Sequence, residues 1–356
     1  MSSSASSSFP APVGGAPIAI DFAPSIVFVC LYIACLPLAI SRIANKRTRT
    51  FILVGTTVLS LERVVNFALR AAASRNPAGF DTKNNMDYFQ SSYGTGYLGL
   101  GQDVMNVLRA YLVGTTRPRS MRPAPPCRTD TEQAQKPLAK ADAGDADAVA
   151  AGAGTHVQEL SVSDAADAPD EPRRRVALRA LFGGAMLLYI LAMVLVTISG
   201  GDYWNGTRSA GAGALVQYTR CVRAAPLRAA TAEMLDADGR AVQGTNAVAI
   251  WAWRTRPARV GAGRVLFVSF ITCLLCIPAT YRLVVMQYHS SGLLSTGPSS
   301  LNMPLEKAGF YALHEAPAWI AVVLLLSVDV RRRFHTGLKG DLSILHDRKP
   351  VGDGAS

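Results

Sequence analysis

The sequence contains little charge for its length. Asp, Glu, Lys and Arg together make up 17% of its 356 residues, against roughly 25% in soluble globular domains. The mean hydropathy is +0.20, although a long polar segment lowers that average. So little charge beside so much apolar sequence excludes an ordinary soluble protein, and the length suits a bundle of about six to eight membrane helices.

Motifs that catalyse or power reactions are also missing. There is no G-x-x-x-x-G-K-[ST] phosphate loop to drive primary transport. There is no HExxH or HxxxH pair for zinc, and only His314 of the five histidines lies in an apolar run. The six cysteines show no disulfide framework, and the Cys273-x-x-Cys276 pair inside an apolar run is interpreted as packing. We therefore expect no enzyme, no metal and no other cofactor.

Long apolar runs are what the sequence has instead. About 20 such residues cross the ~30 Å of bilayer hydrocarbon as an α-helix. Runs of this length extend over residues 23–43, 51–73, 93–114, 176–199, 265–288 and 308–330. The third run also carries a predicted surface for close helix packing, formed by Gly94, Gly96, Gly99 and Gly101.

Polar segments separate and flank these runs. Residues 1–22 are rich in Ser, Ala, Pro and Gly and lack Lys and Arg, which predicts a disordered extracellular tail rather than a signal peptide. Residues 115–175, rich in Ala, Asp, Pro and Arg, have too few large apolar side chains to fold and predict a disordered cytosolic loop. Residues 331–356 form a basic tail.

The positions of the basic residues predict the orientation of the runs. The net charge is +11, and Lys and Arg collect in residues 42–49, 117–122, 173–175, 254–264 and 331–333. This placement fits cytosolic flanks of membrane helices, with the N-terminus outside and the C-terminus inside, rather than a face that binds nucleic acid. The sequon Asn205-Gly-Thr would lie outside, so Asn205 is a candidate glycosylation site.

This orientation requires one more crossing, within residues 209–253. Its two apolar stretches are short, and residues 228–240 between them are too polar to face lipid. We favour a degraded fifth helix; an inserted segment and a six-span topology remain alternatives. The expected fold is all-α, a polytopic bundle of seven transmembrane helices, with helices 1–3 in residues 23–114 and helices 4–7 in residues 176–330.

Ionisable and amide side chains inside the runs form the candidate site. An ionisable group at mid-bilayer costs at least ~2.5–3.5 kcal/mol on insertion scales, so each is a candidate for function. Glu62 and Asn66 share one helix face by their spacing, and Arg63 and Arg70 share another. The candidates are Glu62, Arg63, Asn66, Arg70, Asp103, Asn106, Arg282, His314 and Glu315.

Depth along the helices predicts which of these side chains meet. Arg282 and Glu315 both lie in the outer parts of their runs, which predicts a contact between them. Glu62 and Asp103 lie near the midplane and could meet Arg63 or each other. Such groups can be structural ion pairs that join helices in lipid. The alternative is a polar cavity for a lipid headgroup, a sterol hydroxyl or another small ligand.

Parts of the second run and of the last two resemble a known family. The residues concerned are Glu62, Asn66-Phe67, Arg70, Pro278-Ala-Thr-Tyr-Arg282, Gly292, Glu306, Phe310-Tyr311, Glu315 and Pro317. The pattern resembles the fungal seven-helix aminocholesterol-resistance family, also described as lipid-translocating exporters, and related fungal orphan seven-helix proteins. Pro278 and Val285 stand where that family has Arg and Glu. The resemblance implies seven helices, an outer N-terminus and a role in lipid or sterol stress.

Three functions are compatible with these features. The first is a multi-pass membrane protein that handles or senses lipids, sterols or similar amphipaths. The second is a receptor of the G-protein-coupled type, although Leu108-Arg-Ala-Tyr111 is only vaguely similar to an Asp-Arg-Tyr motif. The third is an inactive structural paralogue. The expected partners are the lipid bilayer and a lipid or sterol ligand, in the plasma membrane or another membrane of the secretory pathway.

Overall fold

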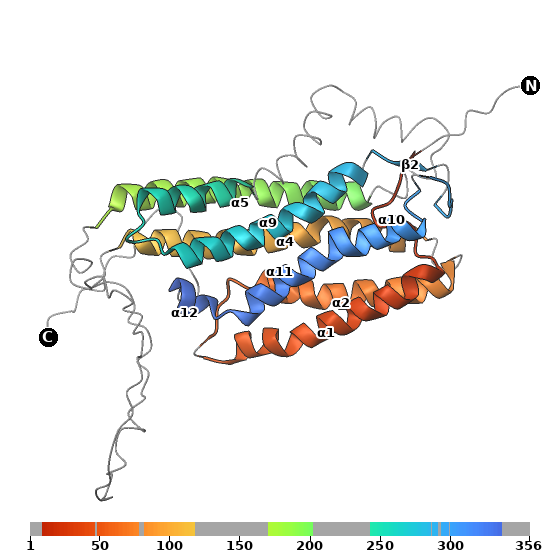
Figure 1. The fold of residues 1–356 in the computed structure, drawn as a ribbon, viewed down its shortest axis with the longest axis horizontal. Helices are drawn as coiled ribbons and strands as arrows, with labels where there is room; N and C mark the ends of the chain where they lie inside the picture. The colour runs from red at the N-terminus through yellow and green to blue at the C-terminus, as the bar shows by residue number, and fades with distance from the viewer. Residues whose placement is uncertain are drawn as a thin grey trace, which may run out of the picture.

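Six long helices run along one common axis in the part of the chain that the structure describes (Figure 1). The computed structural model describes residues 9–46, 48–77, 82–117, 170–201, 243–285, 287–290, 293–298 and 300–336. The long helices are α1 (Phe22–Ala44), α2 (Val54–Arg75), α4 (Lys83–Thr115), α5 (Pro172–Gly201), α9 (Ala262–Val285) and a composite helix over Pro304–Ser327. The predicted all-α fold is confirmed.

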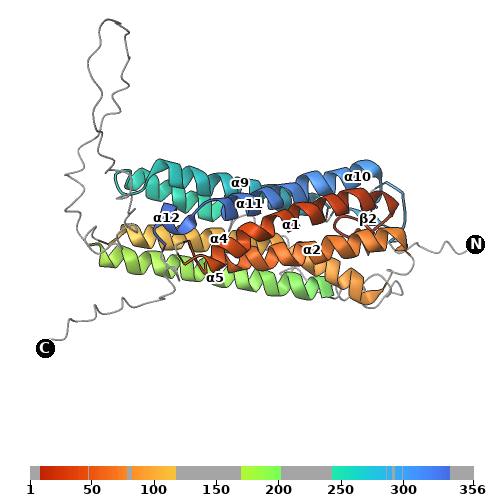
Figure 2. The same cartoon turned by 90° about the horizontal axis from the view of Figure 1, so that it is seen from below.

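The shorter elements lie at the ends of this bundle. They are the two-residue strands β1 (Phe9–Pro10) and β2 (His289–Ser290), the 3₁₀ turn η1 (Ala19–Asp21), a helix at residues 243–255, and α12 (Val330–Phe334). Figure 2, viewed from below, shows α9 and α11 on one side of the bundle, α5 on the other, and α1 and α2 in front.

Among the described residues, four helices are long and apolar enough to cross a membrane: Ala19–Ala44, Pro172–Ile198, Ala262–Val285 and Pro304–Ser327. They leave large apolar side chains uncovered; Leu187 of α5 is 68% exposed and Leu266 of α9 is 67% exposed. Apolar surface on this scale is unfavourable in water but suits hydrocarbon. The fold is that of a helical membrane protein.

The two remaining long helices are α2 and α4, and α4 is the more deeply buried of the two. Most of α4 is buried, with α5 as its main neighbour, and α2 packs mainly against α1. A Cβ on Gly96 would stand 2.1 Å from Arg63 Nη2, and one on Gly94 would stand 2.0 Å from Val196. The predicted close-packing surface is thus confirmed there, whereas Gly99 has open space around it. The helix also begins ten residues before the expected Tyr93, because its mostly polar first turns include Met86, Phe89 and Gln90, which are buried against protein.

The composite helix consists of α10 (Pro304–Gly309), the π-helical turn η3 (Phe310–Glu315) and α11 (Ala316–Ser327). Pro317 at the start of α11 lacks an N–H, and its ring would clash with the carbonyl four residues earlier in a regular α-helix. The wider π-helical turn before it relieves that clash. As a result Phe310, Tyr311, His314 and Glu315 are all buried.

Residues 11–21, the cap segment, cover one end of the bundle. Ala11, Val13 and Ala16 are at most 6% exposed. The Val13 N–H donates to Gln90 Oε1 (3.1 Å) and the Ala16 N–H to Asn302 Oδ1 (2.9 Å). The expectation of a disordered tail over residues 1–22 is therefore wrong for this part. Long-range hydrogen bonds hold these residues in place, and composition does not reveal such bonds.

At the opposite end, which we call the arginine end, arginines from several segments of the described chain donate to backbone carbonyls. Arg42 donates to the Ser327 carbonyl (2.7 Å), Arg331 to the Lys46 carbonyl (2.8 Å) and Arg333 to the Gly263 carbonyl (3.2 Å). The helix at residues 243–255 runs into this end, and α9 starts there.

The two ends of the long loop also meet at the arginine end. The Glu171 N–H donates to the Thr116 carbonyl (3.1 Å), and the Glu171 carboxylate pairs with Arg256 (2.9 Å) and Arg259 (3.2 Å). The expected disorder over 115–175 is therefore wrong for both ends of that segment, because Glu171 fixes them. Residues 118–169, most of the weak fifth span, Asn205 and the tail from residue 337 lie outside the described residues.

Candidate functional site

The predicted polar side chains of α2 and η3 meet inside the bundle. Arg63 is 1% exposed, and its Nη1 lies 3.6 Å from Glu315 Oε1. The same carboxylate oxygen is 2.9 Å from His314 Nδ1. Glu62, the residue before Arg63 on α2, places its Oε2 3.7 Å from Arg63 Nε. His314 and Glu315, two consecutive residues of the π-helical turn η3, are both buried.

Ser92 of α4 completes this group. Its hydroxyl accepts a hydrogen bond from Asn66 Nδ2 (2.7 Å) and donates to Glu62 Oε1. Its carbonyl accepts from Arg63 Nη2 (3.2 Å). Tyr88, one turn earlier, also donates to Glu62 (3.0 Å). We call the set the core cluster: Glu62, Arg63, Asn66, Ser92, His314 and Glu315.

Arg282 reaches the edge of the core cluster without the predicted partner. Its Nη1 donates to the Tyr93 carbonyl (3.2 Å), and its guanidinium lies over the Tyr97 ring at 5.5 Å. The predicted Arg282–Glu315 pair is wrong, because Glu315 pairs with Arg63. The sequence predicted correctly how far along its helix each residue lies. It did not predict which neighbouring side chain each residue faces.

Several buried atoms of the core cluster have no hydrogen-bond partner among the described residues. They are Glu62 Oε2, Arg63 Nε and Nη1, Asn66 Oδ1, His314 Nε2 and Glu315 Oε2. A buried polar group without a partner costs ~1–3 kcal/mol, and more when it is charged. Such atoms call for water or for the polar group of a ligand.

An apolar groove lies beside the core cluster, between α9 and η3. Its volume is about 410 Å³, and it is lined by Cys276, Ile277, Thr280, Tyr281, Val284 and Leu313. Val284 and Leu313 are each 49% exposed on the apolar outer face. Tyr281 connects the groove to the cluster, because its ring lies 5.8 Å from that of His314. Its buried hydroxyl has no hydrogen-bond partner in the described part of the chain.

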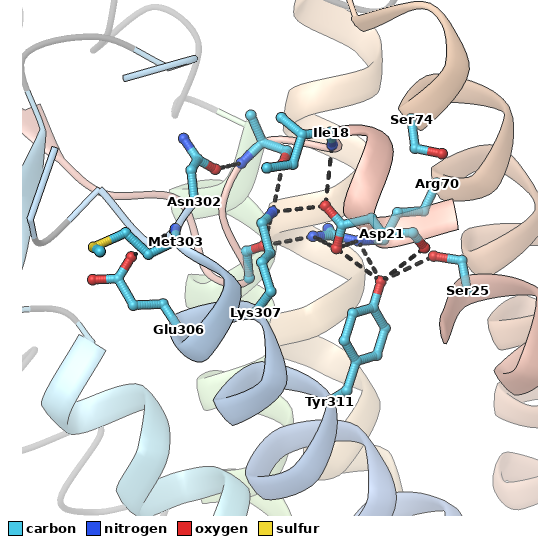
Figure 3. Close-up of polar contacts among 12 residues, drawn as sticks. Ile18, Asp21, Ser25, Arg70, Ser74, Asn302, Met303, Glu306, Lys307 and Tyr311 are labelled. Carbon is cyan, nitrogen blue, oxygen red and sulfur yellow. Dashed lines mark hydrogen bonds and ion pairs between the residues drawn. The ribbon is translucent and has the colours of Figure 1, made fainter. Parts of the chain in front are cut away.

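A second polar group, the cap cluster, joins Arg70 to three residues that sequence reasoning missed: Asp21, Lys307 and Tyr311. Arg70 Nη2 lies 3.0 Å from Asp21 Oδ1, and Lys307 Nζ lies 2.8 Å from Asp21 Oδ2. Tyr311 donates to Asp21 Oδ1 (2.9 Å) and accepts from Arg70 Nε (3.1 Å). Figure 3 shows these side chains converging from η1, α2 and the composite helix.

The cations of the cap cluster also hold the cap segment. Arg70 Nη2 donates to the Gly14 carbonyl (2.5 Å), and Lys307 Nζ donates to the carbonyls of Gly14 (2.8 Å) and Ala16 (2.5 Å). One signal could have identified Lys307 and Tyr311, since their i,i+4 spacing places both on one helix face. No local signal places Asp21 beside Arg70, 49 residues away.

Tyr93 of α4 stands between the two clusters. Its ring centroid lies 5.4 Å from the Arg63 guanidinium and 5.9 Å from that of Arg70. Its hydroxyl accepts from Arg70 Nη1 (3.1 Å). The core cluster and the cap cluster therefore form one continuous polar region in the half of the bundle nearest the cap segment.

Asp103 and Asn106 do not belong to this region. Asp103 Oδ2 accepts from the N–H and the hydroxyl of Thr56, each at 2.6 Å, so its predicted meeting with Glu62 or Arg63 is wrong. It lies ten residues beyond Tyr93 on α4, roughly 15 Å along the axis. Asn106 is half-buried on the same helix.

The described residues contain no group of three His, Cys, Asp or Glu side chains placed to hold a metal ion. Within that part of the chain Cys30, Cys35, Cys273 and Cys276 are free thiols. Comparisons with protein families, with curated proteins and with solved structures find no match for this chain. The function must therefore be argued from the site.

Proposed function

We propose that this chain is a seven-span membrane protein that binds and handles lipid-like amphipaths. The polar group of the ligand is held at the core cluster, and its apolar part lies in the groove between α9 and η3. The observation that carries the proposal is the set of buried core-cluster atoms that have no hydrogen-bond partner among the described residues. They lie directly beside an apolar groove.

An amphipath fits this arrangement better than a small polar solute. Arg63, Glu315 and Asn66 offer donors and acceptors of both signs, which suit a zwitterionic or hydroxyl-bearing headgroup. The groove beside them is on the lipid-facing surface of α9, and its volume of about 410 Å³ is within the ~300–1,000 Å³ usual for ligand sites. The resemblance to lipid-translocating exporters agrees with this chemistry.

The proposed topology has the cap segment outside and the arginine end in the cytosol. α5 ends beside Ser91 near the cap segment, because Ser91 Oγ donates to the Thr197 carbonyl (3.4 Å). α9 starts at the arginine end, so the chain has to return between residues 201 and 262. The helix at 243–255 is 13 residues long, or roughly 20 Å, and supplies the last part of this fifth crossing. The basic residues of the arginine end favour the cytosolic side.

Photo-crosslinking tests the ligand class. The full chain, purified in detergent, is irradiated with phosphatidylcholine and with a sterol, each carrying a diazirine on its apolar part. We expect labelling in residues 276–284 and at Leu313, competed by the unlabelled amphipath. The double variant Arg63→Gln/Glu315→Gln should reduce it about tenfold, because it removes two charge-assisted contacts. Glu62 also loses Arg63, but its side chain is 28% exposed.

Asp103→Asn is the matched control, since it changes a buried carboxylate outside the polar region. It should label like the unchanged protein. If labelling cannot be competed, or if the double variant labels as strongly as the control, the core cluster is not a ligand site. The ion pairs would then serve only to join helices.

A further inference from the structure

The carboxylate of Asp21 occupies a cradle of cationic and hydroxyl donors. Arg70 and Tyr311 contact its Oδ1 at 3.0 and 2.9 Å, and Lys307 contacts Oδ2 at 2.8 Å. The Ile18 N–H donates to the same Oδ2 at 3.1 Å. All three side-chain donors belong to α2 and the composite helix, whereas the acceptor belongs to the cap segment (Figure 3). An oxyanion bound in this way is held by charge-assisted hydrogen bonds, the strongest class in proteins.

Two cations face one carboxylate in the cap cluster. Arg70 and Asp21 are 0% exposed and Lys307 is 2% exposed, so solvent screens their charges little. Glu306, the neighbour of Lys307, turns away and accepts from the Met303 N–H (3.1 Å). Buried charge is favourable only when it is balanced. A phosphate monoester, with a charge of about −1.5 to −2, balances two cations where one carboxylate cannot.

The cradle also lies at the depth of lipid headgroups. Asp21 is the third residue of the span Ala19–Ala44, and Lys307 is the fourth residue of the span Pro304–Ser327. At ~1.5 Å per residue both side chains are within roughly 6 Å of the helix ends, where hydrocarbon gives way to phosphates.

We infer that Arg70, Lys307 and Tyr311 form a binding site for a phosphate monoester group, which Asp21 of the cap segment fills in this structure. The same two cations hold the Gly14 and Ala16 carbonyls. A phosphate that pairs with these two cations therefore also removes their bonds to the cap segment and releases it. Phosphate binding and release of the cap segment are then thermodynamically coupled, so that each favours the other. The site differs from the core cluster in its residues and in its ligand, so it can fail or hold independently of the proposed function.

The test compares three phosphate compounds on the full chain in detergent: short-chain phosphatidic acid, inorganic phosphate and phosphatidylcholine of the same chain length. Binding is read by native mass spectrometry. Release of the cap segment is read by thiol labelling of Val13→Cys, which is 6% exposed as Val, in a chain without other cysteines. We expect phosphatidic acid to bind and to increase labelling, whereas phosphatidylcholine, a zwitterionic diester that the core cluster can hold, should leave the labelling of Val13→Cys unchanged.

Substitutions then identify the site. Asp21→Asn removes the internal competitor and should tighten binding of phosphatidic acid at least about tenfold, whereas Lys307→Met should weaken it about as much. Asp103→Asn should leave it unchanged. If inorganic phosphate acts as well as phosphatidic acid, the site stands and its ligand is a soluble phosphate.

Two results would overturn the inference. The first is a folded Asp21→Asn protein that binds phosphatidic acid no better than the unchanged chain. The second is that saturating phosphatidic acid leaves the labelling of Val13→Cys unchanged. This second result needs no substitution at Asp21, so it applies even if the Asp21→Asn protein does not fold. Either would show that Asp21 is only the structural counterion of the cap segment.

Discussion

At the scale of single residues, the polar region depends on how its charges are paired. Arg63 and Glu315 are 1% and 0% exposed, and each has another charged or ionisable neighbour, Glu62 and His314 respectively. Removing one partner of a buried pair leaves the other uncompensated, which costs ~3–5 kcal/mol, whereas removing both often costs far less. The pair therefore contributes more to the choice of one helix arrangement than to net stability.

Because Arg63 and Glu315 are paired, the losses of stability caused by substituting each of them should not add. Glu315→Gln alone should lower the free energy of unfolding by ~3–5 kcal/mol, and adding Arg63→Gln should recover most of that loss. Thermal unfolding of the purified chain in detergent measures both. Glu62→Gln is the comparison, because the Glu62 side chain is 28% exposed and the effect there should be smaller. Additive losses would contradict the pairing.

The cap segment depends on two glycines in the left-handed region, Gly14 (φ +75°) and Gly15 (φ +63°). A Cβ on Gly15 would stand 2.3 Å from the Leu301 carbonyl oxygen. Gly15→Ala should therefore destabilise the closed cap by ~1–3 kcal/mol and speed thiol labelling of Val13→Cys. Gly297→Ala, where only Ser295 Oγ is near, at 3.5 Å, is the control. Equal labelling rates in the two variants would show that the cap segment does not need this turn.

At the scale of elements, the apolar runs were predicted well and the polar segments poorly. The bounds expected for α1, α5 and α9 differ from the observed ones by only a few residues. Hydropathy identifies such helices directly because their side chains face lipid. The first turns of α4 and the whole cap segment were missed because protein, not lipid, surrounds them.

The candidate site was likewise predicted only in part. Helix periodicity correctly grouped Glu62 with Asn66 and Arg63 with Arg70 on α2. It could not supply partners from other helices, such as Arg63 for Glu315, or the π-helical turn that Pro317 imposes. It also missed Asp21 and Lys307, which lie at the ends of their helices and meet only when the cap segment folds over.

The contact between Thr116 and Glu171 makes the long loop between α4 and α5 dispensable for the bundle. Replacing residues 118–169 by a Gly/Ser linker of about eight residues should leave the melting temperature unchanged or slightly higher, since shorter loops cost less entropy to close. Circular dichroism in detergent checks this. Glu171→Gln should lower the melting temperature, because Arg256 and Arg259 lose their partner. Loss of the folded protein on loop replacement would contradict the prediction.

At the scale of the whole molecule, charge and polarity are divided along the bundle axis. At the arginine end Arg42, Arg331 and Arg333 donate to backbone carbonyls. Arg256 and Arg264 donate there to the Glu171 carboxylate and the Tyr111 hydroxyl. The other half contains both polar clusters beneath the cap segment. If the core cluster binds a ligand as we propose, the groove between α9 and η3 offers a route to it from the lipid-facing side.

The orientation of this axis is the last prediction, and it is tested in intact cells. In a chain without other cysteines, Leu305→Cys, 83% exposed near the cap segment, should react with an impermeant thiol reagent. Thr255→Cys, exposed at the arginine end, should react only after the membrane is permeabilised. The positive-inside rule is the reason, because the basic residues lie beside the helix ends at that side.

The reverse pattern of labelling would invert the bundle and place the cap segment in the cytosol. In that case the phosphate site would face the leaflet rich in anionic lipids, and its ligand would come from the cytosolic side. Labelling of both positions from outside would contradict a membrane crossing by α9, which lies between them in the chain. A seven-span protein, and with it the likeness to lipid-translocating exporters, would then no longer be tenable, although the contacts of the two polar clusters would stand unchanged.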